Sequence, residues 1–556
     1  MKKSFWILLF SLLLPRAVQA QTGTCEPALG EAYLDAGNVR ARILNNGGLF
    51  WRGSPHVYEI DGTDAIFAAG IWIGGMINDT LHTAASRYGP WEFWAGPLDD
   101  LGNPPADCSI YDQIWEIRTK DFQLYFETDS ISTNLQNWPW QLGAPVVDGD
   151  GNPNNYNLQG GDLPELLGDQ RLWWIMNDRG NIHEATNTAP LGIEVHATAF
   201  AFANPTTLGN ITFYEYNIIN KNSAPITETY VGLFSDVDLG NFDDDFVGSD
   251  SLNHLGFAYN SDNFDEGGEG YGNAPPAIGF TFTETLLADD DGLDNNRDGS
   301  IDEAGEMLGV TSMMNYYGGG GVNGDPQHGP DYYNLMKALH KDDMPILLGY
   351  RGYPHRNSVP PDFPRETTRF FFPGDPVTKA FWSEFNLDNQ GTAENPADRR
   401  FVTSTGPFTI ARGDTVTIRP AIIWSRGNDH LDSITVLRKD TRAVRRASTS
   451  LYASRTPQSI PTPEIPEKGF VLGFDQNFPN PFSESTTIQY SLPQSMQVKL
   501  AIYNVLGQEI SVLVNTRQEA GIYSVDFEAK NLPAGVYFAK AQFDFLQFTK
   551  RMLIIR

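Results

Sequence analysis

The segment of the sequence best suited to chemistry is an acidic run from Asp289 to Glu306, in which eight of eighteen residues are Asp or Glu. Its spacing matches a twelve-residue calcium-binding loop. The residues at loop positions 1, 3, 5, 6 and 7 are Asp294, Asn296, Asp298, Gly299 and Ser300. Carboxylate and amide oxygens that wrap around a glycine turn are the ligands that a hard cation needs. The run therefore predicts a calcium site.

The end of this loop departs from the pattern, because Gly305 stands where a bidentate glutamate is expected. Asp302, Glu303 or Glu306 would have to supply that ligand. No helical pattern flanks the loop, so it resembles the free-standing calcium loops of thrombospondin type 3-like repeats. The alternative is an acidic surface loop that binds no ion.

A second acidic cluster follows the strand-like run from Tyr230 to Phe234. Gly240 and Asn241 interrupt the cluster, and its spacing fits no fixed loop pattern. We expect calcium here too, in a structural rather than a catalytic role, although a charged surface loop is an equal alternative. The candidate ligands are Asp236, Asp238, Asp243 and Asp245, with Asp244 and Asp250 nearby.

Motifs for catalysis are incomplete. His183-Glu184 lacks the second histidine of a zinc protease, and the glycine run from Gly318 to Gly321 lacks the Lys-Ser/Thr of a phosphate loop. No G-x-S-x-G nucleophile motif occurs. A carboxylate pair for glycoside hydrolysis needs only proximity in space, so the sequence neither identifies nor excludes one. We predict no catalytic residues.

Tryptophans are concentrated in the first third of the chain. Exposed tryptophans would stack on sugar rings, whereas buried ones would belong to the core of a β-protein, which is the favoured interpretation. The residues concerned are Trp72, Trp91, Trp94, Trp115, Trp138, Trp140, Trp173 and Trp174.

The elements that must position these residues are mostly strands. Short apolar runs separated by Gly, Pro, Asn and Asp predict an all-β, multi-domain β-sandwich body with long loops. The body is long enough to suggest two modules. The predicted strands are Phe122–Glu127, Ile193–Phe202, Ile211–Asn220, Thr229–Phe234, Phe408–Ile410 and Val416–Trp424.

One helix is predicted at the end of the body. Asn428 or Asp429 can cap it, and apolar residues from Leu431 to Leu451 recur at helical spacing. Its other face is basic, including Arg438 and Arg442. We interpret that face as solvated and ion-paired to an acidic body, with a binding patch as the alternative.

The last part of the chain, from Val471 to Arg556, has the pattern of a small Ig-like β-sandwich. Alternating runs at Thr486–Tyr490, Val498–Tyr503, Ile522–Phe527, Val536–Phe543 and Phe548–Ile555 are joined by turn residues. It contains no reactive constellation.

Four short sequence motifs in this segment resemble those of a known domain family. NFPNPF (477–482), YNVLGQEI (503–510), LPAGVY (532–537) and KRMLIIR (550–556) resemble the type A C-terminal sorting domain of type IX secretion cargo from Bacteroidota. The resemblance implies passage across the outer membrane, with the secretion machinery as a partner. Phrases in the body, such as AAGIWIGG (68–75), are similar to secreted Bacteroidota proteins of unassigned activity.

The N-terminus agrees with export. Lys2 and Lys3 precede an apolar stretch, and small residues before Gln21 predict a signal peptide over residues 1–20. The secreted body then spans 21–454, a proline-rich linker 455–470 and the sorting domain 471–556. Cys25 and Cys108 are the only cysteines, and in an oxidising compartment they could form a disulfide or remain two buried thiols.

Charge limits the partners of the body. Residues 21–470 contain 62 acidic and 29 basic residues, which argues against binding nucleic acid or an anionic membrane. We predict an exported, calcium-stabilised protein of the cell surface or the medium with a structural, adhesion or interaction role. A glycan-binding protein or a polysaccharide-degrading enzyme is the alternative.

Overall fold

The computed structural model describes two compact units, residues 24–452 of the body and residues 473–555 near the C-terminus, each considered by itself. The description omits residues 54–56, 289–291, 293, 296–300, 303–304, 354–364, 475–476, 478–479, 481, 484, 493–495, 505–507, 520, 530–531 and 544–545. The predicted signal peptide and the predicted linker lie outside the described residues.

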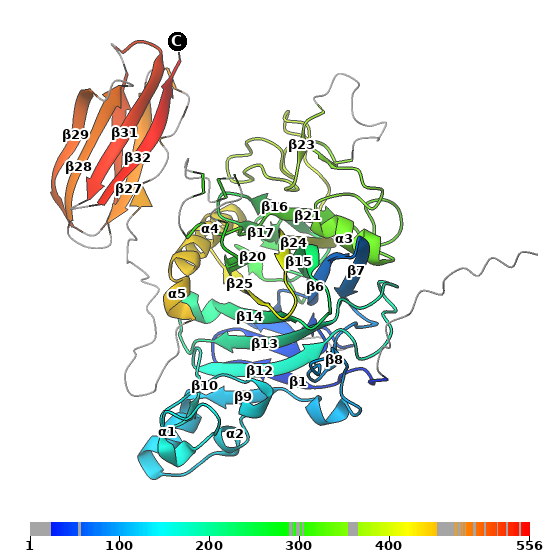
Figure 1. Cartoon of the computed structure of the whole chain (residues 1–556). Coiled ribbons are helices and arrows are strands. Elements are labelled where there is room, and N and C mark those ends of the chain that lie inside the picture. Colours follow the sequence, from blue (N-terminus) through cyan, green and yellow to red (C-terminus); the bar gives the residue numbers. More distant parts are fainter. Residues whose placement is uncertain are drawn as a thin grey trace, which may run out of the picture. The chain divides into compact units, whose positions relative to one another are not determined.

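The body is built on two large antiparallel sheets, as predicted for an all-β protein (Figure 1). In the first sheet the order is β21-β24-β15-β6-β3-β2-β4-β5, with β1 paired to β2 and β7 to β6. Its strands are β1 (Glu31–Leu34), β2 (Arg40–Leu44), β3 (Gly48–Leu49), β4 (Tyr58–Ile60), β5 (Thr63–Asp64), β6 (Ala68–Ile77), β7 (Thr80–Ala85), β15 (Ile226–Val237), β21 (Ser312–Tyr316) and β24 (Arg399–Ile410).

The second sheet has the order β16-β17-β20-β25-β14-β13-β12-β8, with β9 paired to β12. Its strands are β8 (Trp94–Ala95), β9 (Trp115–Arg118), β12 (Gln170–Asn177), β13 (Ile193–Ala201), β14 (Ile211–Asn220), β16 (Asp245–Asp250), β17 (Leu255–Asn260), β20 (Ala277–Glu284) and β25 (Thr415–Ser425). The predicted strands at 193–202, 211–220, 229–234, 408–410 and 416–424 are confirmed.

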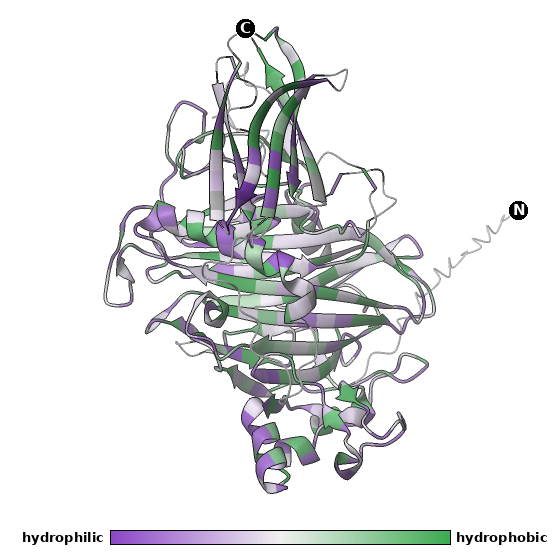
Figure 2. Ribbon diagram, turned by 90° about the vertical axis from the view of Figure 1, so that its left-hand side faces the viewer, coloured by the Kyte–Doolittle hydropathy of each residue, from purple (hydrophilic) through white to green (hydrophobic). Residues whose placement is uncertain are grey.

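A single hydrophobic core joins the two sheets. Trp72 and Leu233 of the first sheet belong to the same buried cluster as Trp174 and Ile278 of the second. Hydrophobic residues run along the strands of both sheets (Figure 2). Although the length of the body suggests two modules, the described part clusters as one compact unit.

Helices cover the outer faces of the sheets. The predicted C-terminal helix of the body is confirmed as α4 (His430–Arg446), where Asp429 accepts hydrogen bonds from the backbone N–H groups of Leu431 and Asp432. Arg438 on its basic face forms ion pairs with Asp250 and Asp375, and with its side chain only 17% exposed it is ion-paired rather than solvated. The other α-helices of the described body are α1 (Thr119–Thr128), α2 (Thr133–Gln136), α3 (Gly329–Met336) and α5 (Ser448–Leu451).

The strand predicted at Phe122–Glu127 is wrong, because these residues form most of α1. Phe122, Leu124 and Phe126 alternate as in a strand, yet only Phe122 is buried. The Asp121 carboxylate instead accepts the N–H of Arg118 and so caps the first turn of a helix. Among the described helices, none has the length and apolar character to cross a membrane.

Cys25 and Cys108, for which the sequence leaves two states open, are joined as a disulfide beside Trp94. Short strands pair in loops that leave the sheets: β10 (Val146–Val147) with β11 (Leu163–Pro164), β18 (Phe264–Asp265) with β19 (Gly272–Asn273), and β22 (Ile346–Leu347) with β23 (Thr367–Thr368).

The C-terminal unit has a three-stranded and a four-stranded sheet around its own core. All five predicted strands are confirmed, whereas β26 and β29 were not predicted. The strands are β26 (Gly473–Phe474), β27 (Ser485–Leu492), β28 (Met496–Asn504), β29 (Glu509–Gln518), β30 (Gly521–Glu528), β31 (Gly535–Phe543) and β32 (Leu546–Ile554).

Candidate functional site

Three carboxylates gather where β15 ends and β24 begins. The two strands are antiparallel, with Asp236 opposite Arg400 and Val237 opposite Arg399. Continuing this register by one residue puts Asp238 opposite Asp398. Since residues two apart share a face of an extended chain, Asp236 in β15 and Asp238 just after it face the same way as Asp398. One oxygen of each side chain lies within 4.8 Å of the others, and we call Asp236, Asp238 and Asp398 the aspartate trio.

Arg400 supplies positive charge to part of the trio. Its Nε lies 3.1 Å from Asp236 Oδ1, and its Nη2 donates to Asp398 Oδ2 at 2.9 Å. The Nε–H itself is directed at the hydroxyl of Tyr88, which in turn donates to Asp236 Oδ2. For the carboxylate of Asp238, the described residues provide neither a hydrogen-bond donor nor an ion-pair partner. One arginine thus faces three acidic groups.

The electrostatics of the trio favour an additional cation. Burial raises the pKa of Asp236 to about 6, although Arg400 and the Tyr88 hydroxyl oppose the shift. Burial, followed by the charges of Asp236 and Asp398, raises the pKa of Asp238 to about 8. Like charges in a poorly solvated site can be relieved either by protons or by a bound cation. Calcium needs six to eight oxygens, so backbone carbonyls or water would have to complete its coordination.

The other two ligands predicted in this cluster, Asp243 and Asp245, are not members of the trio. Asp243 is exposed, and Asp245 is fully buried, with its Oδ2 accepting the N–H of Leu239 at 3.1 Å. Burial raises the pKa of Asp245 well above its usual value. The structure therefore brings two of the four predicted ligands, Asp236 and Asp238, into one carboxylate group.

The predicted calcium loop at 289–306 is described only in part, because Asn296, Asp298, Ser300 and Glu303 lie outside the described residues. Among those that are described, Asp302 Oδ1 accepts the N–H of Gly292 at 2.8 Å. Asp294 is also described, and it belongs to neither of the groups of three converging carboxylates found among the described residues. The calcium assignment of this loop stays a prediction.

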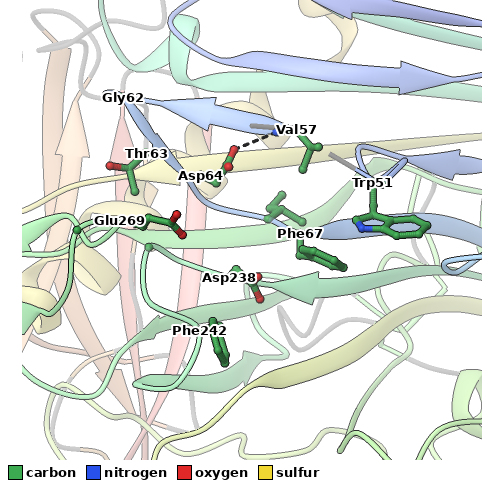
Figure 3. Close-up of a pocket in the computed structure, with 13 residues that line it drawn as sticks. Trp51, Val57, Gly62, Thr63, Asp64, Phe67, Asp238, Phe242 and Glu269 are labelled. Carbon is green, nitrogen blue, oxygen red and sulfur yellow. Dashed lines mark hydrogen bonds between the residues drawn. The ribbon is translucent and has the colours of Figure 1, made fainter. Parts of the chain in front are cut away.

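A pocket of about 470 Å³ adjoins the trio and shares Asp238 with it (Figure 3). Asp64 at the end of β5 and Glu269 on the loop between β18 and β19 add two further carboxylates. The rings of Trp51 and Phe67 lie beside each other, 5.9 Å apart, beyond the acidic side chains. The remaining lining residues are Gly53, Val57, Gly62, Thr63, Ile66, Gly240, Phe242 and Gly268.

Aromatic side chains of this pocket reach solvent. Phe67 is 37% exposed and Phe242 is 47% exposed, whereas most large apolar residues of the body are buried. Of the tryptophans considered from the sequence, Trp72, Trp94, Trp138, Trp173 and Trp174 are buried, which favours the core interpretation for these five. Trp51, which lines the pocket, was not among those considered.

Sequence reasoning also missed Asp398 and Glu269. Asp398 meets Asp238 through the pairing of β24 with β15, and Glu269 lines the same pocket from the distant β18–β19 loop. A separate group, Asp148, Asp150 and Asp162, brings its oxygens within 4.8 Å as well. The carboxylates of Asp148 and Asp162 accept N–H groups of their own loop, including those of Gly149 and Gly151. These hydrogen bonds account for that arrangement.

Comparison with known proteins identifies one part of the chain. Residues 476–555 match the family model of the secretion system C-terminal sorting domain. No curated protein matches the chain. Among solved structures, the chain is similar to a polysaccharide lyase at 8% identity and a TM-score of 0.22, over 74% of this chain and 38% of the lyase. The chain thus spans well under half the length of that structure.

Proposed function

We propose that this chain, which the sorting domain at residues 476–555 marks as cargo of the type IX secretion system, acts outside the cell as a calcium-stabilised adhesion or interaction protein. The sorting domain indicates export to the cell surface or the extracellular medium, with the type IX machinery as a partner during delivery. The role of the body once it has been exported is the subject of the proposal.

The observation that carries the proposal is the convergence of Asp236, Asp238 and Asp398 within 4.8 Å where β15 ends and β24 begins. Arg400 balances only part of their charge, and the carboxylate of Asp238 opens into a pocket. A divalent cation there would tie β15 to β24, two neighbouring strands of the first sheet. Such a cation stabilises a folded protein because the unfolded chain cannot offer the same site.

Calcium titration tests the proposal. The melting temperature of the body is expected to rise by a few degrees between chelator and calcium at about 100 times the dissociation constant, which corresponds to about 2.7 kcal/mol. The double variant Asp238→Asn with Asp398→Asn should remove the contribution of the trio. Asp243→Asn, which changes an exposed acid outside the trio, is the matched control and should keep the full response.

The loop at 289–306 is tested in parallel, since it is the second predicted calcium site. Asp294→Ala with Asp298→Ala should lower the number of bound calcium ions per chain by one, and the trio variant should lower it by one more. Equal melting curves with and without calcium in the unmodified protein would contradict the proposal.

A glycan-binding or polysaccharide-degrading role is the second candidate. The observation in its favour is the pocket that combines the rings of Trp51, Phe67 and Phe242 with three carboxylates, because aromatic faces stack on sugars. Incubation with a panel of polysaccharides distinguishes the candidates. Retention without cleavage supports a glycan binder, and newly released reducing ends support an enzyme. If neither is observed, the adhesion or interaction role is favoured.

A further inference from the structure

The chemistry of the pocket beside the aspartate trio can be read from its lining residues. Three of them, Asp64, Asp238 and Glu269, carry carboxylates, and none of the described lining residues is basic. The carboxyl of Asp238, with its pKa raised to about 8, is largely protonated near neutral pH. The acceptors of the pocket are therefore chiefly the side chains of Asp64 and Glu269, since an ionised carboxylate accepts hydrogen bonds but donates none. The N–H of Gly240, a lining glycine, already donates to backbone carbonyls, including that of Asp64 at 3.0 Å. Among the described lining residues the side-chain donors besides Asp238 are the indole N–H of Trp51 and the hydroxyl of Thr63, so carboxyl groups dominate the polar lining.

A ligand that complements this lining must donate hydrogen bonds and carry positive charge. An alkylammonium group has three donors and no acceptor, whereas a sugar hydroxyl requires both kinds of partner. Sugar sites generally meet that requirement with amide or basic side chains, and the described lining has neither. Charge complementarity thus favours the ammonium group over a neutral sugar.

The aromatic rings suit the rest of such a ligand. A cation over the face of a tryptophan or phenylalanine ring is attracted by the ring quadrupole, and the methylene stem of a lysine packs on apolar surface. Trp51 and Phe67 lie beyond the acidic side chains, and Phe242 lies near Asp238 (Figure 3). The exposed rings of Phe67 and Phe242 leave the pocket open to a side chain that enters from solvent.

We propose that the pocket formed by Trp51, Phe67, Phe242, Asp64, Asp238 and Glu269 binds a lysine side chain presented by a protein partner. This inference rests on the proposed role as an interaction protein and names the chemistry of its partner. The body, with its strong excess of acidic residues, would also attract a basic partner over a distance.

Binding of Nα-acetyl-lysine amide to the full chain tests the inference, with the Nε-acetylated compound as the uncharged control. Saturable binding of the first compound, measured by calorimetry or by ligand-observed NMR, is expected together with no binding of the second. Glu269→Gln should weaken binding about fivefold, which corresponds to about 1 kcal/mol for one exposed charge contact. Phe242→Leu should weaken it as well.

Matched controls separate the pocket from general attraction to an acidic protein. Asp243→Asn removes the same charge as Glu269→Gln, yet Asp243 does not line the pocket. That variant should bind as the unmodified protein does. Circular dichroism and the melting temperature establish that each variant is folded.

Three results would overturn the inference: equal binding of the acetylated compound, equal losses in Asp243→Asn and Glu269→Gln, or binding of a neutral oligosaccharide that Phe242→Leu abolishes while the lysine compound does not bind. Asp398→Asn distinguishes failure here from failure of the calcium proposal, because Asp398 belongs to the trio and does not line the pocket. That variant should lose the response of the trio to calcium and still bind the lysine compound.

Discussion

At the scale of single residues, Arg400 binds the same carboxylates that a cation at the trio would bind. It contacts both Asp236 and Asp398, and its side chain is only 15% exposed. Removing one partner of a buried ion pair leaves an uncompensated charge, which typically costs about 3 kcal/mol or more. We expect Arg400→Met to lower the free energy of unfolding by about 3 kcal/mol in chelator, and by less in calcium, because the ion would replace the lost charge.

Urea unfolding with chelator and with calcium measures both values. Arg412→Met is the matched control, since Arg412 is an exposed arginine beyond the end of β24. It should change stability little in either condition. An equal loss for Arg400→Met with and without calcium would argue against an ion at the trio.

The sequence identified two of the three members of the trio, for a physical reason. Asp236 and Asp238 lie two residues apart at the end of an apolar run, so their shared face follows from strand periodicity. Asp398 joins them only because β24 pairs with β15 in one particular register, and no local pattern in the sequence encodes that pairing. The pocket is less predictable still, since Trp51, Asp64, Asp238 and Glu269 come from four separate segments.

At the scale of elements, α4 places an acidic residue against the second sheet. The Ser425 hydroxyl of β25 donates to Asp440 Oδ2 at 2.7 Å, and burial raises the pKa of Asp440 to about 6. Because this pKa lies above the ordinary value of 3.8, the folded state holds the proton more tightly than the unfolded state. The resulting stabilisation is fully present below about pH 4 and is lost as the pH rises through about 6.

Asp440→Asn removes this titration. The variant should be more stable than the unmodified protein at pH 8 by up to about 3 kcal/mol, and the difference should shrink steadily toward pH 5. Chemical unfolding at a series of pH values measures it. A difference that does not depend on pH would show that the pKa of Asp440 is the same in the folded and the unfolded protein.

The elements were predicted best where burial and periodicity agree. Ile211–Asn220 became β14 with the predicted bounds, and Asp429 caps α4 as expected. Where they disagree the prediction was wrong, as at Phe122–Glu127, because a local capping interaction outweighed an alternating pattern. β29 was not predicted, because its residues are exposed or half-buried and its sequence therefore shows little alternation of apolar and polar residues.

At the scale of the whole molecule, the disulfide belongs to one unit only. Cys25 and Cys108 are 83 residues apart in the body, and the chain has no other cysteine. Closing a loop of this length stabilises a folded chain by on the order of 4 kcal/mol in the chain-entropy model. Reduction should therefore lower the melting transition of the body and leave that of the C-terminal unit unchanged.

Calorimetry of the full chain, with and without reductant, resolves the two transitions. Alkylation of the reduced thiols prevents the bond from forming again during the scan. A common shift of both transitions would mean that the two units unfold together, contrary to their separation into distinct compact bodies.

The order of strands also sets when the body can fold. β24 lies between β21 and β15, and β25 lies between β20 and β14. Neither sheet can therefore complete its strand pairing before residues 399–425 are present. Such distant pairing gives a high contact order, and folding rates fall as contact order rises. The two sheets of the body should therefore stay incomplete until almost the whole body has been synthesised. Slow folding would suit a chain that is exported, whereas its unpaired strand edges would meanwhile need protection from aggregation.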